Sequence, residues 1–95
     1  MGTAPAHQDF DAARSWRLHP QVALRPEPFG ALLYHFGTRK LSFLKNRAIL
    51  AVVDSLDQHA DARSACRAAG IDDDQQEPYL RALGVLAASN MLVPR

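Results

Sequence analysis

The apolar residues of this chain change their spacing near Ser42. Before this point, from Val22 onward, short apolar segments fit strands, with residues two apart, such as Val22 and Leu24, on one face. After this point apolar residues recur at the spacing of one side of a helix. A run of strands followed by a run of helices is typical of an α+β domain. The sequence therefore predicts a winged-helix-like α+β fold, in which a three-stranded antiparallel sheet is followed by three helices.

Three short strands account for the alternating part. The first is predicted over 22–25, because prolines flank it and proline favours strand ends and edges. The second covers 31–36, the segment "ALLYHF", whose aromatic residues suit a half-buried sheet. Gly37 and Thr38 supply the turn, and the third strand returns over 38–42. In the second strand Leu32, Tyr34 and Phe36 are expected on one face, and Leu33 and His35 on the other.

Two helices follow directly. Ser42 is the expected N-cap of the first, 43–59, because a serine hydroxyl accepts a hydrogen bond from a first-turn amide. The second, 60–71, is rich in alanine and is expected to pack closely against a neighbour. Gly70 is expected to end it in a left-handed conformation, followed by a hydrophobic contact from Ile71.

The third helix and the two ends of the chain complete the layout. Regular helix is expected to begin within 74–77, because Pro78 is tolerated only in a first turn. The short apolar segment 91–93 is expected to pack back onto the domain. At the other end, 1–13 shows no periodicity and is predicted to be a mobile tail, in which Phe10 stays loose. The peptide-recognition domain proposed below would then occupy 14–95.

Composition limits the classes of function. A chain of 95 residues forms one domain. Eleven basic and ten acidic residues leave it near neutral, which favours neither nucleic acid nor an anionic membrane as a partner. No apolar run approaches the ~20 residues that cross a bilayer. Cys66 is the only cysteine, so no intrachain disulfide forms, and a reducing, cytoplasmic setting fits.

No residue pattern indicates catalysis or a bound metal. The four histidines (His7, His19, His35 and His59) show no paired spacing on a common element. The acidic run 72–74 lacks the spaced ligands and the glycine of a calcium-binding loop. Arg63 and Arg67 flank Cys66 and would lower its thiol pKa if it were exposed, but the alanine-rich surroundings favour a buried packing residue. We expect no enzyme activity, no metal and no cofactor.

Two kinds of binding remain. The second and third helices resemble a helix-turn-helix, but the third begins with three aspartates and has only Arg81 in its interior. Those carboxylates would repel phosphates, so a winged-helix DNA-binding protein is the less favoured alternative. The other use of such a fold is peptide capture at a sheet edge. Strand 38–42 is a candidate edge, and Leu80, Leu83, Gly84 and Ala87 of the third helix would form the facing wall, although Leu83 fits a core position better.

A family resemblance supports the second use. The segment "RLHPQVALRPEPFGALLYHFGTRKLSFLKNRAILAVVDSLD" and the later "YLRALGVLAASNMLV" resemble the MftB family of mycofactocin biosynthesis chaperones. That family belongs to the PqqD-like peptide-recognition domains, known as RiPP recognition elements. The likeness extends over 16–93, and its more specific part is 18–44. Pro78, near the start of the last helix, departs from the family pattern.

The resemblance implies a non-catalytic peptide chaperone. It implies binding of the leader of a ribosomally made precursor peptide (MftA-like) and its presentation to a radical SAM maturase (MftC-like). In such families the leader joins the third strand as an extra strand and lies against the third helix. Carried onto this chain, the resemblance implies peptide-binding positions at Thr38, Arg39, Lys40, Leu41 and Ser42 of the strand, and at Leu80, Leu83, Gly84 and Ala87 of the helix.

Three questions stay open at this point. Arg39 and Lys40 either attract acidic leader residues or only protect the edge. An exposed edge is also able to pair with a copy of itself, so a homodimer is an alternative. Finally, a chain of this kind would show no affinity for the isolated precursor if it were only a structural subunit of its partner.

Overall fold

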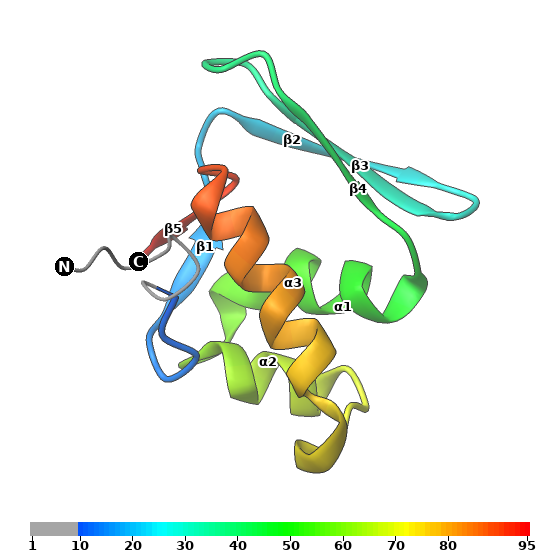
Figure 1. Cartoon of the computed structure of the whole chain (residues 1–95), viewed down its shortest axis with the longest axis vertical. Helices are drawn as coiled ribbons and strands as arrows, with labels where there is room; N and C mark the ends of the chain where they lie inside the picture. The colour runs from blue at the N-terminus through cyan, green and yellow to red at the C-terminus, as the bar shows by residue number, and fades with distance from the viewer. Residues whose placement is uncertain (1–9) are drawn as a thin grey trace, which may run out of the picture.

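The computed structural model describes residues 10–95, and Figure 1 shows how its elements are arranged. A three-stranded antiparallel sheet lies at one end of the molecule, and α2 lies at the other. The strands of this sheet, in spatial order, are β2 (Val22–Glu27), β3 (Gly30–His35) and β4 (Leu41–Leu44). The helices are α1 (Arg47–Ser55), α2 (Ala62–Ala68) and α3 (Glu77–Ala88), with single 3₁₀ turns at Leu56–Gln58 and Asp73–Gln75. The predicted α+β class is confirmed.

A second, two-stranded sheet was not predicted. It joins β1 (Trp16–Leu18) to β5 (Leu92–Pro94) in antiparallel register, with Leu18 opposite Leu92. The expected return of 91–93 onto the domain is confirmed, since Met91 and Leu92 are fully buried. This sheet and the placing of all three helices after the β2–β3–β4 meander make the likeness to a winged helix a loose one.

The three-stranded sheet has an inner and an outer face. The inner face packs on the core, because β3 and β4 contact α1 and their buried side chains belong to the same apolar cluster as residues of α3 and β5. Leu33 and His35 lie on this face and Tyr34 on the opposite one, as the alternation predicts. The buried apolar residues that share this core include Ala31, Leu33, Leu44, Ile49, Val52, Val53, Leu83, Leu86 and Leu92.

The third strand begins later than the sequence predicts. It is Leu41–Leu44 rather than 38–42, and Thr38, Arg39 and Lys40 lie in the turn that precedes it. The side chain of His35 explains the longer turn, because its Nδ1 accepts hydrogen bonds from the backbone N–H groups of Gly37 (3.0 Å) and Thr38 (3.1 Å). These bonds hold the chain in a loop where an extended strand was expected.

Arg39 closes this loop. Its backbone is in the left-handed region at a φ of 66°, and its N–H donates to the carbonyl oxygen of His35 at 2.7 Å. The N–H of His35 in turn donates to the carbonyl oxygen of Lys40 at 3.0 Å, which starts the β3–β4 ladder. The basic pair therefore sits at the tip of the hairpin rather than within its strand.

The N-cap of the first helix is also displaced. Ser42 was predicted to cap a helix starting at 43, but it lies inside β4. The cap is Asn46, whose backbone is extended and whose side-chain Oδ1 accepts a hydrogen bond from the N–H of Ile49 at 2.9 Å. Both residue types cap helices well, so the cap preference alone did not distinguish them. The consequence for function is that Phe43 and Leu44 belong to the edge strand.

The later helix signals behave as predicted. Asp61 caps α2 through a hydrogen bond from the N–H of Ser64 at 2.7 Å. Gly70 ends α2 with a φ of 88°, and Ile71 is buried beside it, which confirms the predicted left-handed end. Helix α3 begins at Glu77, within the predicted range, and Pro78 lies in its first turn.

The start of the described chain is packed rather than loose. The ring of Phe10 stacks on Trp16 with 4.7 Å between centroids, in contrast to the loose position expected for it. The carbonyl oxygen of Asp11 accepts from the indole N–H of Trp16 at 2.8 Å. That of Ala12 accepts from the N–H of Ala62 at 3.1 Å. The rest of the expected tail, 1–9, lies outside the described residues.

Candidate functional site

Strand β4 is an edge of the three-stranded sheet. In the order β2–β3–β4 it pairs only with β3, so one side of its backbone has no strand partner among residues 10–95. Bonded and non-bonded pairs alternate in an antiparallel ladder. Because His35 bonds to Lys40, the next bonded pairs are Leu33 with Ser42 and then Ala31 with Leu44. It follows that the backbone N–H and C=O groups of the intervening residues, Leu41 and Phe43, point away from β3.

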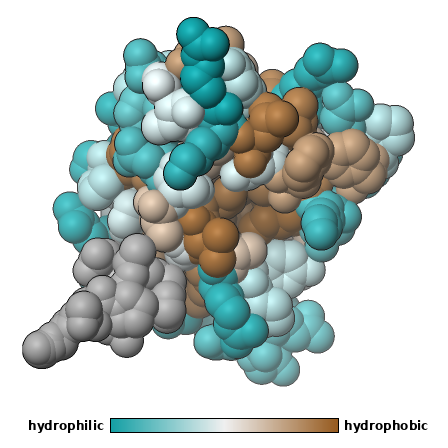
Figure 2. All heavy atoms as spheres, turned by 45° about the horizontal axis from the view of Figure 1, so that its top comes forward, coloured by the Kyte–Doolittle hydropathy of each residue, from teal (hydrophilic) through white to brown (hydrophobic). Residues whose placement is uncertain are grey.

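An apolar hollow of about 600 Å³ lies along this free edge, between β4 and α3. Figure 2 shows apolar side chains gathered there and over the adjoining face of the sheet. The wall contributed by the β4 side is Ser42, Phe43, Leu44, Lys45, Asn46 and Ile49. The wall contributed by α3 is Pro78, Tyr79, Ala82, Val85 and Leu86. We call this hollow the β4–α3 groove.

The exposed side chain of Val85 borders the groove, and packing of the core does not explain an apolar residue at this position. Val85 keeps 59% of its surface exposed, although its neighbour Leu86 is 5% exposed and part of the core. Phe43, on the opposite wall, is 57% exposed, but its side chain lies on the outer face of the sheet and its backbone faces the free edge. An exposed apolar side chain on the α3 wall of this hollow favours binding of an apolar ligand.

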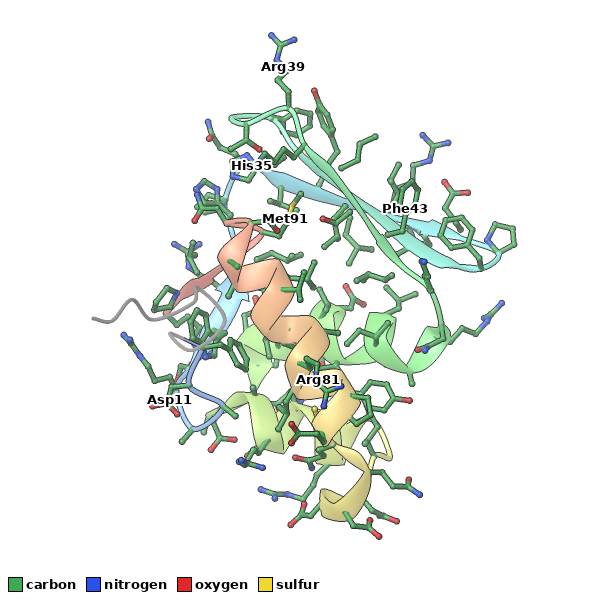
Figure 3. The ribbon with its side chains drawn as sticks, in the orientation of Figure 1. Asp11, His35, Arg39, Phe43, Arg81 and Met91 are labelled. Atoms are coloured by element: carbon green, nitrogen blue, oxygen red, sulfur yellow. The ribbon has the colours of Figure 1, made fainter. Side chains whose placement is uncertain are left out.

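The charges around β4 are cationic. Arg39 and Lys40 precede the strand and Lys45 follows it, and all three are exposed. Within the described chain none of them forms an ion pair. Figure 3 shows Arg39 at the tip of the β3–β4 turn, directed away from the fold. A ligand with carboxylates near either end of β4 would meet unpaired positive charge.

The structure places only some of the strand residues predicted for the site beside the groove. Ser42 lines the groove, and Leu41 offers its backbone to the free edge while its side chain faces outward. Thr38, Arg39 and Lys40 lie beyond the end of the strand, in the turn. Their contact with a peptide stays a prediction, and their position suits charge attraction better than ladder pairing.

The helix residues predicted for the site do not line the β4–α3 groove. Leu83 is fully buried in the core. Leu80 and Gly84 border a separate hollow, next to Phe10 and Arg63. Ala87 borders a third one, beside Trp16. Peptide contact by these four side chains stays a prediction, but it is not favoured by the orientation of the helix.

The residues of α3 that face β4 also recur at helical spacing. They are offset by one position along the chain from the helix residues predicted for the site. Tyr79, Ala82, Val85 and Leu86 form this stripe. The signal was present in the sequence as a second run of apolar positions, but α3 is apolar around most of its circumference. The rotation of the helix about its axis therefore had to come from tertiary packing.

The rotation of α3 about its own axis is fixed at the start of the helix by hydrogen bonds of Gln76. The side chain of Gln76 is buried, and its Nε2 donates to the carbonyl oxygen of Ile71 at 3.3 Å and to the carboxylate of Asp73 at 3.1 Å. Its Oε1 has no hydrogen-bond partner among the described residues. A buried amide with these partners ties the helix start to the end of α2.

The described residues offer little for catalysis. No group of three or more histidine, cysteine, aspartate or glutamate side chains in 10–95 is placed to hold a metal ion. Cys66 is fully buried, as predicted, and burial raises the pKa of its thiol despite the opposing effect of Arg63 and Arg67. No helix in that range has both the length and the apolar character to cross a bilayer.

Comparison with known proteins identifies relatives over nearly the whole chain. Residues 15–93 match the model of a family described as the peptide chaperone MftB family. A protein of Mycobacterium tuberculosis (strain ATCC 25618 / H37Rv), named peptide chaperone MftB, is 76% identical over 92% of this chain and 80% of its own length. A protein of the same name from Mycolicibacterium smegmatis (strain ATCC 700084 / mc(2)155) is 72% identical over 99% of this chain and 93% of its own. No solved structure matches.

Proposed function

This chain belongs to the peptide chaperone MftB family, and on that premise we propose that it is a non-catalytic chaperone that binds a peptide along β4. The observation that carries the proposal is the free edge of β4 beside an apolar hollow. An extended peptide would pair its backbone with the N–H and C=O groups of Leu41 and Phe43.

Side chains alternate in direction along an extended peptide, so those of the bound peptide would point to two opposite sides. Every second side chain would point toward the β4–α3 groove, where Tyr79, Ala82 and Val85 offer apolar contact. The remaining side chains would extend the outer face of the sheet next to Phe43. The peptide segment that fits best therefore carries apolar residues at alternating positions.

The basic side chains at the two ends of β4 would select which peptide residues flank the apolar segment. Lys45 lies at one end of β4, and Arg39 and Lys40 lie at the other. Carboxylates flanking the apolar segment would be attracted to both ends, which speeds encounter and helps to select the register. Of the two roles considered for the basic pair, the unpaired state of its charges supports attraction of the peptide.

The partner named by the family resemblance fits this site. We take the peptide to be the leader of an MftA-like mycofactocin precursor, which the chain presents in the cytoplasm to an MftC-like radical SAM maturase. Residues 14–95 would form the peptide-recognition domain. Binding through backbone pairing and side-chain burial requires no cofactor.

Calorimetry with the full-length precursor peptide tests the proposal. We expect saturable binding with a dissociation constant of about 1 μM or tighter, near −8 kcal/mol. Backbone amide shifts recorded in the same titration should be concentrated in β4 and in the Tyr79, Ala82 and Val85 stripe. Absence of heat at protein concentrations of tens of micromolar would overturn the proposal. Amide shifts confined to the hollow beside Leu80 and Gly84 would instead place the peptide on the other side of α3.

DNA binding has no comparable support. The 3₁₀ turn before α3 carries exposed Asp73 and Asp74, and α3 begins with exposed Glu77. Asp73 pairs with Arg67, and Glu77 pairs with Arg81. A gel shift at low salt with tight, steeply salt-dependent binding would be required to revive that alternative.

A further inference from the structure

The outer face of the three-stranded sheet is apolar and open. Cross-strand neighbours share a face, so the register defines its rows. The rows across this face are Arg25, Leu32 and Phe43, then Ala23, Tyr34 and Leu41. Phe29 and Phe36 extend it at the two turns, with ring centroids 6.1 Å from Phe43 and 5.0 Å from Tyr34 respectively.

This face differs from what an isolated sheet presents to water. The solvent side of an antiparallel sheet normally carries polar residues. Here no element among residues 10–95 covers it, yet its large apolar side chains stay substantially exposed: Phe29 46%, Phe36 59%, Leu41 54% and Phe43 57%. A cluster of this kind on a small protein marks an interaction surface.

The border of the face is positively charged. Arg25 lies within it, Arg39 and Lys40 at one end of β4, and Lys45 at the other. Glu27, the acidic residue of β2, is paired with Arg25 at 2.9 Å. An apolar centre with a cationic border complements an apolar surface bordered by carboxylates.

The same charges argue against a second copy of this chain as the occupant. Both ends of β4 carry cations, so a two-fold related copy would bring cations against cations whichever end met which. Like charges facing one another across an interface disfavour association.

The location of the face indicates what kind of protein would bind it. Phe43 belongs both to the outer face and to the wall of the β4–α3 groove. A protein docked on the outer face would therefore lie directly beside a peptide bound along β4. Such a position suits an enzyme that receives the peptide.

We infer that the outer face of the β2–β3–β4 sheet docks a second protein whose surface is apolar and bordered by carboxylates, and that this protein is the enzyme that modifies the bound peptide. The choice of enzyme rests on the proposed function. The face itself is defined by Phe29, Phe36 and Arg25, none of which lies in the peptide groove.

Two variants test the inference. The double variant Phe29→Ser/Phe36→Ser removes exposed side chains at the two turns and should weaken binding of the MftC-like maturase at least about tenfold. Arg25→Glu should weaken it as well, and more at low salt than at high salt. The matched control is Arg67→Glu, an exposed arginine in a similar surface ion pair on α2, which should leave maturase affinity unchanged. All three should bind the precursor peptide as the wild type does.

The measurements separate this inference from the proposed function. Wild type that binds the maturase but not the peptide, with loss of maturase affinity in the two variants, would support the face and refute peptide binding. Unchanged maturase affinity in both variants, or no maturase binding by the wild type, would overturn the inference. Loss of peptide affinity in the double variant, or a wild-type dimer that the double variant converts to monomer, would also overturn it. Thermal unfolding of each variant confirms that it is folded.

Discussion

Phe43 lies directly opposite Leu32 in the β3–β4 register, at a pair whose backbone groups do not bond to each other. Its side chain is thereby placed on the outer face of the sheet, while its N–H and C=O point to the free edge. One residue thus contributes to both surfaces through different atoms.

This relationship allows backbone pairing to be tested with a single proline. Phe43→Pro removes an N–H that faces the open edge and no bond of the β3–β4 ladder, as Pro26 already does on the opposite edge strand. We expect Phe43→Pro to weaken peptide binding beyond the loss seen in Phe43→Ala by about 1 kcal/mol or more, the worth of a hydrogen bond. Calorimetry on both variants measures the difference. Equal affinities would show that the peptide does not pair with this N–H.

Contact between α3 and the peptide is tested at Val85, which borders both the β4–α3 groove and the hollow beside Leu80. Val85→Asp places a carboxylate in the apolar groove and should lower peptide affinity at least about tenfold, because a charge is then desolvated on binding. Ala88→Asp is the matched control, since it adds the same charge to the same part of the helix at an exposed position outside the groove. If the control lost as much affinity as Val85→Asp, charge rather than contact would explain the effect.

Gly30 sets the close approach between the start of β3 and the end of β4. It has a φ of 154°, and a Cβ added there would collide with the carbonyl oxygen of Leu44. We expect Gly30→Ala to reduce the free energy of unfolding by roughly 1–3 kcal/mol and to weaken peptide binding by displacing β4. Chemical denaturation and calorimetry measure the two effects.

Gly70→Ala is the control that distinguishes the effect of backbone strain from the effect of displacing β4. Gly70 also has a positive φ, at 88°, but nothing lies within 4 Å of an added Cβ. This variant should be destabilised by strain alone, roughly 1–2 kcal/mol, and should bind the peptide normally. A Gly30→Ala protein that bound the peptide equally well would show that β4 tolerates the shift.

His35 is expected to stabilise the turn that carries the basic pair. Its Nδ1 accepts from two backbone N–H groups, those of Gly37 and Thr38. His35→Leu removes this acceptor and should lower the free energy of unfolding by roughly 1–3 kcal/mol. His35→Asn keeps an oxygen near the same place and should retain part of that stability, so thermal unfolding of the pair tests the role of the acceptor. Equal destabilisation would assign the effect to packing alone.

Cys66 should be chemically inert in the folded protein. Burial both blocks access to the thiol and raises its pKa, so the reactive thiolate is scarce near neutral pH. Alkylation by iodoacetamide at pH 8 should be slow in the native state and fast in denaturant, as mass spectrometry would show. Rapid labelling of the native protein would indicate that α2 opens readily.

Much of the architecture could be predicted from local pattern. The apolar alternation located β2 and β3, and the helical spacing located all three helices, because each element must bury one continuous face. Gly70 and Pro78 marked helix ends through restrictions on their own backbone, which act independently of distant contacts. The start of β4 was misplaced because the bonds from Gly37 and Thr38 to the His35 ring are not visible in a propensity pattern.

The sequence by itself determined that a sheet containing a basic pair at its last strand would be followed by helices, since periodicity and charge are local properties. Only the tertiary structure placed that pair in the turn before β4. It also decided which side of α3 faces the free edge of β4. The helix is apolar around most of its surface, so its rotation depends on what buries Leu83 and Gln76 on one side. That packing leaves Tyr79, Ala82 and Val85 facing β4, where a groove forms.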